Sequence, residues 1–265
     1  MSAKLLLGKP CADSICDSVK KQLAKRIGKL YTVGLDNDAW KQYSTSLHKS
    51  ATKYGFDCEE ITVSDKVSAD EFCSIVENVC NRVDCTGVIV QQPLPKEYAS
   101  VVNFVKVEKD VDCLNPLSVA KLYKGETGLY PATPLAVLRL LDYYGINLQG
   151  KHVVIVGRGN AVGKPLALMA LQRNATVTVC HTKTVDLPAI CRSADVLITA
   201  CGVAGLITNE FVNPHSIVVD VGLSFVDGKT CGDVSSEVQD VAAAVSPVRG
   251  GVCPVTRANL FVNLC

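Results

Sequence analysis

The sequence has no long apolar run, although 48% of its 265 residues are hydrophobic. A helix that crosses a membrane needs roughly eighteen or more consecutive apolar residues, and the N-terminus offers only Lys4 and three leucines, too little for a targeting segment. The net charge is also small, at +1, and Lys and Arg are mixed with Asp and Glu. No basic stripe is therefore available for nucleic acid or an anionic bilayer. We expect a cytoplasmic protein without nucleic-acid or membrane partners.

Cysteine pairs with the spacing of metal ligands are missing as well. The thirteen cysteines are odd in number, spread along the chain and never spaced C-x-x-C. Cys80, Cys180 and Cys201 lie in apolar runs, where a free thiol behaves as a small core residue. The four histidines are scattered without ligand spacing. We expect no metal site and no disulfide framework.

From Lys151 onward, apolar runs alternate with segments of helical period. The pattern predicts strands over residues 153–156, 175–180, 196–200 and 217–221. Runs that are apolar on both faces are typical of parallel sheets covered by helices. The second half is therefore predicted to be a Rossmann-like domain with a doubly wound parallel sheet.

The first half predicts a second α/β layer arrangement. Short strands are expected over residues 31–33, 60–63 and 87–90, with helical periodicity over 36–54 and 68–81. A further helix is expected over 133–144, because Pro134 suits a first helical turn and Gly145 a helix end. The fold class is thus α/β, with an N-terminal α/β substrate domain ahead of the Rossmann-like domain.

The stretch GRGNAVGKP at 157–165 directly follows the apolar run 153–156. A strand that leads into a glycine-bearing turn and a helix places unpaired N–H groups at the positive end of the helix dipole, where a pyrophosphate can bind. Gly157, Gly159 and Gly163 are spaced G-x-G-x-x-x-G, one residue longer than the usual fingerprint. The turn predicts a dinucleotide site, with a purely structural strand-turn-helix unit as the alternative.

The residues around this turn favour NADP over NAD. Arg158 can reach an adenosine 2′-phosphate, and Thr182 and Lys183, at the end of the next predicted strand, offer that phosphate a hydroxyl and a cation. An acidic residue at this strand end would favour the free 2′-hydroxyl of NAD, and none is present. The alternative is that Arg158 is a surface cation and Thr182 a helix cap.

Segments along nearly the whole chain match one protein family in order. They are VIVQQPLP at 88–95, KDVDCLNP at 109–116, YPATP at 130–134, GRGNAVGKP at 157–165, NATVTVCHTKT at 174–184 and PVRGGVCPVT at 247–256. They resemble, respectively, the V-Q-L-P-L-P, K-D-V-D-G, P-C-T-P, G-R-S-x-x-V-G-x-P, N-A-T-V-T-x-C-H-S-x-T and P-V-P-G-G-V-G-P-M-T segments of the methylenetetrahydrofolate dehydrogenase/cyclohydrolase family.

The resemblance implies an NADP-dependent 5,10-methylenetetrahydrofolate dehydrogenase of one-carbon metabolism that forms a homodimer. It implies a folate-binding catalytic domain over 1–132, to which 247–265 returns, and an NADP-binding domain over 133–246. The cofactor residues that it implies are Gly157, Arg158, Gly159, Gly163, Thr182 and Leu223. Gly250 and Gly251 are expected to contact the folate substrate.

The same resemblance places the catalytic residues. Asp112 corresponds to the family's pterin-binding aspartate, and a carboxylate can accept two parallel hydrogen bonds from an amino-pyrimidinone edge. Gln91 and Pro93 are implied to line the folate site, and Tyr43 to offer its ring to the folate. The alternatives are that Asp110 and Asp112 only cap or turn the chain, and that Tyr43 packs on a helix.

The chain departs from the family at one catalytic position. The family helix carries Y-x-x-x-K, whereas here Tyr43 is followed four residues later by Leu47. Hydride transfer mainly needs orientation and proximity, but hydrolysis of the methenyl product needs proton transfer, which a lysine can supply and leucine cannot. Cyclohydrolase activity is therefore predicted to be weak or absent, and Gln91 needs another partner.

Cys113, Arg249 and Cys253 replace a glycine, a proline and a glycine of the family segments. Side chains at such positions narrow or reshape a cleft. Two other functions therefore stay open: a non-catalytic protein that binds folate or NADP, and an oxidoreductase that acts on another ligand, with Arg249 attracting an anionic group.

Overall fold

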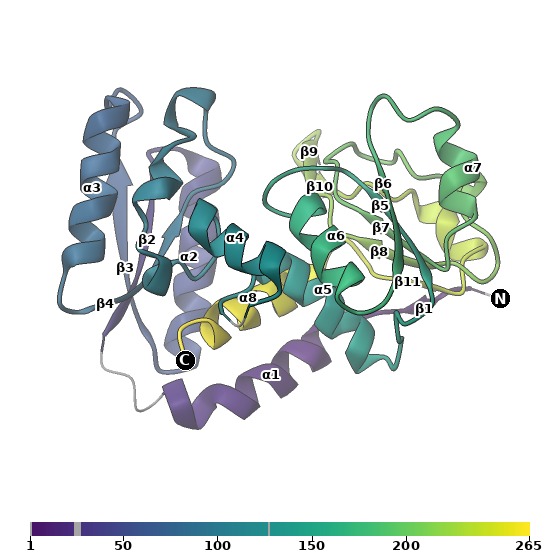
Figure 1. Ribbon diagram of the computed structural model, residues 1–265, viewed down its shortest axis with the longest axis horizontal. Coiled ribbons are helices and arrows are strands. Elements are labelled where there is room, and N and C mark those ends of the chain that lie inside the picture. The colour runs from purple at the N-terminus through teal and green to yellow at the C-terminus, as the bar shows by residue number, and fades with distance from the viewer. Residues whose placement is uncertain (1, 24–27, 127) are drawn as a thin grey trace. The chain divides into compact units, whose positions relative to one another are not determined.

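The chain folds into two compact α/β units in the computed structural model, which describes residues 2–23, 28–126 and 128–265 (Figure 1). The first unit comprises Met1–Asp13 and Thr133–Thr256, and the second comprises Ser14–Ala132 and Arg257–Cys265. Residues 247–256 thus group by contact with the second-half sheet. How folate and NADP binding divide between 1–132 with 247–265 and 133–246 stays a prediction.

The elements alternate between strand and helix over most of the chain. The α-helices are α1 (Gly8–Leu23), α2 (Asp38–Lys53), α3 (Ala69–Asn81), α4 (Pro116–Lys124), α5 (Ala132–Tyr143), α6 (Gly163–Leu171), α7 (Leu187–Arg192) and α8 (Val252–Val262). The strands are β1 (Lys4–Leu5), β2 (Lys29–Leu35), β3 (Asp57–Val63), β4 (Cys85–Val90), β5 (His152–Val156), β6 (Thr176–Cys180), β7 (Val196–Thr199), β8 (Ile217–Asp220), β9 (Ser224–Val226), β10 (Lys229–Cys231) and β11 (Ala244–Val245).

The sheet of the first unit has the strand order β1-β11-β8-β7-β5-β6, and every pair in it is parallel. This confirms the Rossmann-like domain, and β5 to β8 lie within a residue of the expected strands. The inner strands β5 and β7 are almost entirely buried, whereas β6, at the edge, is partly exposed. The antiparallel β9–β10 hairpin forms a separate ribbon.

The sheet of the second unit has the order β3-β2-β4, with all strands parallel. Tyr31 and Val33 of β2 join a buried cluster with Phe72 and Val76 of α3. Between them in β2, the hydroxyl of Thr32 lies 3.1 Å from that of Ser44 on α2. Because side chains alternate along a strand, α3 and α2 cover opposite faces, as Figure 1 shows.

Helix α2 carries the position at which the sequence departs from the family. It begins after Asn37, whose side-chain oxygen accepts a hydrogen bond from the Trp40 N–H at 2.9 Å, a regular N-cap. Its buried side chains follow at helical spacing: Trp40, Ser44, Leu47 and Ala51. Leu47 is 0% exposed, so it belongs to the apolar face of the helix.

All thirteen cysteines are free thiols, and Cys80 and Cys180 are fully buried, as expected of core residues. In the described ranges, no group of His, Cys, Asp and Glu is arranged to hold a metal ion. None of the helices in these ranges combines the length and apolar character that crossing a membrane requires.

The loop before α4 is organised by Asp110, which is only 2% exposed. Its carboxylate accepts hydrogen bonds from the backbone N–H of Leu114 at 3.1 Å, from that of Asn115 at 2.8 Å and from the hydroxyl of Ser118 at 2.7 Å. Burial raises the pKa of Asp110, and these donors counteract that rise. Asp110 thus turns the chain before α4, whose N-cap is Asn115.

We expect Asp110→Ala to lower the free energy of unfolding by about 3 kcal/mol or more. Three buried donors would lose their acceptor, and each unsatisfied group costs roughly 1–3 kcal/mol. Urea unfolding followed by circular dichroism measures the change, with the exposed Asp65→Ala as the matched control. Equal unfolding midpoints for the two variants would contradict the assignment.

Candidate functional site

The carboxyl end of β5 is the switch point of the first sheet. The chain passes from β5 to β6 on one side, and then returns to β7 on the other side of β5. Loops diverge at such a point, so open parallel sheets bind ligands there. The turn of residues 157–162 starts at this end of β5 and leads into α6.

The three glycines of this turn have different surroundings. Gly157 has φ +125°, and a Cβ atom there would overlap the carbonyl oxygen of Ala200. A Cβ atom on Gly163 would overlap the carbonyl oxygen of Gly157. Around Gly159, by contrast, a Cβ atom would meet no atom within 4 Å. Gly157 and Gly163 thus allow close packing, while Gly159 leaves exposed backbone that a ligand can approach.

The start of α6 is suited to an anion. No side chain caps the helix at Val162. The N–H of Lys164 donates to the carbonyl oxygen of Gly159 at 3.1 Å, so the positive end of the helix dipole, more than a set of open N–H groups, favours a phosphate here. Arg158 is exposed, and none of the salt bridges formed by the described residues involves it. The open backbone, the uncapped helix and the unpaired cation together fit the pyrophosphate and phosphate groups of a dinucleotide.

The turn after β6 leaves Thr182 and Lys183 exposed. It is closed by other groups, because the N–H of His181 donates to the hydroxyl of Thr184 at 2.8 Å. The N–H of Lys183 donates to Nδ1 of His181 at 3.1 Å. The next helix, α7, begins after Asp186 and has no side-chain cap, so Thr182 does not cap it, and Thr182 and Lys183 are both exposed.

Two buried aspartates that the sequence interpretation missed organise the neighbouring loops. Asp220 ends β8 and is 4% exposed, and its Oδ1 accepts hydrogen bonds from the N–H of Gly222 at 3.0 Å and of Asp233 at 3.1 Å. The Thr199 hydroxyl donates to the same oxygen at 3.2 Å. Burial, the largest cause, raises the pKa of Asp220 to about 6.

Asp233 is 0% exposed and holds the loop after β7. Its carboxylate accepts hydrogen bonds from the N–H of Cys201 and of Val203, both at 2.8 Å, and from the Cys201 thiol at 3.2 Å. Burial and this carboxylate raise the pKa of Cys201 to about 12. Cys201 is a free, half-buried thiol that packs against the core of the first unit.

Glycines make room for both carboxylates. A Cβ atom on Gly222 would overlap the carboxylate of Asp233, and one on Gly232 would overlap that of Asp220. Asp220 ends an apolar run with a glycine two residues later, whereas Asp233 directly follows a glycine outside any apolar run. Leu223, 47% exposed, follows directly in the loop that Asp220 holds.

In the second unit, two predicted folate residues lie at the carboxyl end of the sheet. Tyr43, in the first half of α2, is 41% exposed, and its ring stacks on Trp40 with centroids 5.7 Å apart. Gln91 directly follows β4, and its Oε1 accepts a hydrogen bond from the N–H of Leu35, at the end of β2, at 2.8 Å. Pro93 follows after a cis peptide bond.

Asp112 comes to the same end of this sheet. Asp110 forms an isolated parallel bridge with Val88, so the chain runs beside β4 in the same direction as the strand. Asp112 is half-buried, and no donor within the described residues contacts its carboxylate. Burial, with a smaller contribution from Asp110, raises the pKa of Asp112 to about 6. Asp112 is thus an unpaired acceptor, unlike Asp110.

The departures from the family segments have distinct structural consequences. Cys113 is buried with φ +57°, a conformation that favours glycine, and its thiol lies 3.3 Å from the Leu129 carbonyl oxygen. Arg249 is exposed, with a long contact of 3.5 Å to the Thr230 hydroxyl. Cys253 is half-buried in α8.

Gly250 and Gly251 lie in the first unit. Gly250 has φ +85°, and its carbonyl oxygen accepts a hydrogen bond from the N–H of Gly8 at 2.7 Å. A Cβ atom on Gly251 would overlap the carbonyl oxygen of Pro247. Both positions therefore need glycine for the turn itself, whatever they contact in a complex.

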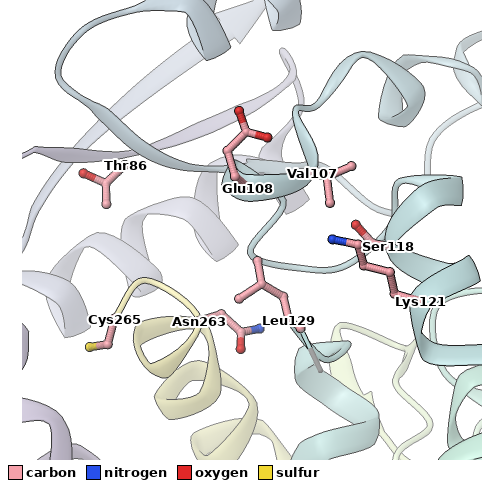
Figure 2. Close-up of a pocket in the computed structure, with 9 residues that line it drawn as sticks. Thr86, Val107, Glu108, Ser118, Lys121, Leu129, Asn263 and Cys265 are labelled. Carbon is pink, nitrogen blue, oxygen red and sulfur yellow. The ribbon is translucent and has the colours of Figure 1, made fainter. Parts of the chain in front are cut away.

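The second unit contains a pocket of about 470 Å³ (Figure 2). It is lined by Thr86, Val107, Glu108, Ser118, Lys121, Gly128, Leu129, Asn263 and Cys265. Asn263 donates to the carbonyl oxygens of Val111, at 2.7 Å, and of Tyr130, at 2.9 Å. Tyr43, Gln91 and Asp112 do not line it.

An open glycine turn at the switch point of a parallel sheet is the arrangement of a dinucleotide-binding α/β protein. Two family models match the chain: "Tetrahydrofolate dehydrogenase/cyclohydrolase, catalytic domain" over residues 6–112 and "Tetrahydrofolate dehydrogenase/cyclohydrolase, NAD(P)-binding domain" over residues 131–265. The chain belongs to the tetrahydrofolate dehydrogenase/cyclohydrolase family, as its motifs indicated.

Relatives match over the full length. The bifunctional protein FolD of Ruminiclostridium cellulolyticum is 39% identical over 273 residues, covering 99% of this chain and 96% of the relative. The FolD structure from Campylobacter jejuni has a TM-score of 0.93 at 35% identity and covers 99% and 97% of the two chains. The Trypanosoma brucei dehydrogenase-cyclohydrolase, complexed with NADP and an inhibitor, has a TM-score of 0.92 at 30% identity and covers 100% and 96%.

The glycine turn allows a direct test. We expect Gly159→Ala to raise the Kd for NADP by roughly tenfold or more, about 1.4 kcal/mol, without lowering the melting temperature, because its Cβ atom meets only open space. Gly163→Ala is the contrasting variant and should lower the melting temperature, because its Cβ atom overlaps backbone. Calorimetry and thermal unfolding measure both. An unchanged Kd in Gly159→Ala would show that the ligand does not approach there.

Proposed function

We propose that the protein is an NADP-dependent 5,10-methylenetetrahydrofolate dehydrogenase with weak or absent cyclohydrolase activity. The observation that carries the proposal is the open turn at Gly159 beside the unpaired Arg158, in a chain that belongs to this family. The FolD relatives are named as bifunctional, so the two activities are considered separately. The family resemblance also supports a homodimer, which analytical ultracentrifugation tests.

The preference for NADP follows from charge at the cofactor site. Arg158, Thr182 and Lys183 are exposed at the ends of two adjacent strands, where a 2′-phosphate would find two cations and a hydroxyl. No acidic side chain at the end of β6 competes for a free 2′-hydroxyl. The related T. brucei enzyme was solved with NADP. Bound NADP supplies the hydride acceptor.

Orientation of the folate is the task of the second unit. The unpaired Asp112 carboxylate can accept two hydrogen bonds from the pterin edge. Tyr43 presents an exposed aromatic ring, and Gln91 is held in place by its bond to the Leu35 N–H. The folate nitrogen lone pairs drive hydride departure, so positioning is the protein's main contribution to this step.

Hydrolysis makes a different demand, which Leu47 does not meet. A buried leucine can neither activate water nor transfer a proton. Gln91, which the family resemblance makes the partner of a lysine, accepts a hydrogen bond from the N–H of Leu35 at 2.8 Å. The site therefore retains what the dehydrogenase reaction needs, without a proton-transfer group at residue 47.

We expect purified protein to reduce NADP with 5,10-methylenetetrahydrofolate and to accumulate the methenyl product. Leu47→Lys should then introduce hydrolysis of that product, because desolvation at this buried position lowers the pKa of a lysine. Absorbance of NADPH and of methenyltetrahydrofolate, followed in one sample, measures both steps.

Leu47→Met is the matched control, because it changes shape without adding a proton-transfer group. Rapid hydrolysis by the unmodified protein would contradict the assigned role of Leu47. NADP binding without turnover would instead favour the non-catalytic binding protein.

Asp112 makes the dehydrogenase step sensitive to pH. Its raised pKa of about 6 means that the carboxylate is protonated at lower pH and can no longer accept both pterin hydrogen bonds. We expect kcat/KM to fall about tenfold for each pH unit below about 6, since this ratio reports groups of the free enzyme. Asp112→Asn should be poorly active with a flat profile over this range, and Asp65→Asn should keep the full profile. A profile that is the same with and without Asp112 would contradict this role.

A further inference from the structure

The pocket shown in Figure 2 is bordered by side chains that hold residues 110–113 in place. The hydroxyl of Ser118 donates to the carboxylate of Asp110 at 2.7 Å. The side-chain amide of Asn263 donates to the carbonyl oxygen of Val111 at 2.7 Å. Both donors line the pocket, so a molecule bound there would contact the groups that fix this loop.

Asp112 lies between residues that these contacts anchor. After it in the chain, the thiol of Cys113 donates to the carbonyl oxygen of Leu129 at 3.3 Å, and Leu129 lines the pocket too. The carboxylate of Asp112 itself accepts no hydrogen bond from the described residues. Its position therefore depends on the anchored residues before and after it, and the pocket supplies a partner on each side.

The pocket also offers two opposite charges and an apolar border. Lys121 extends from α4 into the space that Figure 2 shows, and Glu108 lines the same pocket. Neither forms a salt bridge with any other of the described residues. Val107 and Leu129 add apolar surface. The volume of about 470 Å³ falls in the usual range of small-molecule sites, roughly 300–1,000 Å³.

This lining selects for a molecule that carries both charges. A simple anion would be attracted by Lys121 and repelled by Glu108, and a simple amine would meet the reverse. An α-amino acid carries a carboxylate and an ammonium group on one carbon atom, so it can pair with both side chains. An apolar side chain on that carbon would suit the surface of Val107 and Leu129.

We propose that this pocket binds a small α-amino acid with an apolar side chain, and that the bound amino acid strengthens folate binding. The second part rests on the proposed function, in which Asp112 binds the pterin. A ligand that contacts Ser118, Asn263 and Leu129 favours the arrangement in which they hold the loop. Asp112 is then fixed before the substrate arrives, and a group that is already ordered binds its partner more tightly.

Calorimetry with L-leucine tests the pocket directly. We expect L-leucine to bind the unmodified protein, and Lys121→Gln and Glu108→Gln each to raise its Kd by roughly two- to fivefold, as for exposed charge pairs. The double variant should raise the Kd further. Lys124→Gln is the matched control, because Lys124 is exposed on the same helix but does not line the pocket, and it should leave the Kd unchanged.

Two analogues of L-leucine separate the two charges. 4-Methylpentanoate lacks the ammonium group and 3-methylbutylamine lacks the carboxylate, so each should bind more weakly than L-leucine. Binding of either analogue as tightly as L-leucine would overturn the assignment of an amino acid. Failure of L-leucine to bind, or an unchanged Kd in the Lys121→Gln/Glu108→Gln variant, would overturn the site.

The effect on folate is measured as KM for 5,10-methylenetetrahydrofolate with and without saturating L-leucine. We expect KM to fall about fivefold, the lower end of typical coupling between two sites. Lys124→Gln should keep this response, and the Lys121→Gln/Glu108→Gln variant should lose it. An unchanged KM in unmodified protein that binds L-leucine would overturn the coupling. No turnover with or without L-leucine would overturn the proposed function, whereas the calorimetry would still decide the site.

Discussion

Both units depend on one constraint: parallel strands bring their carboxyl ends to the same edge of a sheet. In the first unit this edge carries Gly159 and Arg158 after β5, and Thr182 after β6. In the second unit it carries Gln91, with Asp112 running beside β4. The strands supply the core, and the first residues beyond them supply the chemistry. Residues far apart in the sequence are thereby collected without long loops.

The sequence predicted the strands that are long and apolar, because burial on both faces leaves a continuous hydrophobic run. It did not predict β1 and β11, which are two residues each, too short for any periodicity. Nor did it indicate the pairing of Asp220 with the backbone of Asp233, since hydrogen bonds between distant loops leave no local pattern. Contacts between residues far apart in the sequence could therefore be found only in the folded chain.

The roles of Asp110 and Asp112 also could not be separated from the sequence alone. Asp110 and Asp112 are two residues apart and chemically identical, and a capping role was open for both. In the fold, Asp110 takes three hydrogen-bond donors, while Asp112 is left without one. Family motifs identified which aspartate to consider, but only the accounting of donors distinguishes a structural carboxylate from one that is available to a ligand. Similarly, the sequence alone shows that Leu47 replaces the family's lysine. The hydrogen bond between Gln91 and the N–H of Leu35 is visible only in the structure.

The two buried aspartates and their glycines are interlocked. The carboxylate of Asp233 fills the space beside Gly222, and that of Asp220 fills the space beside Gly232. Each loop thus supplies one carboxylate, which packs against the glycine of the other loop, and one glycine, which leaves space for the other carboxylate. A chimera that exchanged only one of these loops with an unrelated dehydrogenase would introduce a clash or a hole at the other. The segments 220–222 and 232–233 are therefore structurally coupled, and a substitution in one of them requires a matching change in the other.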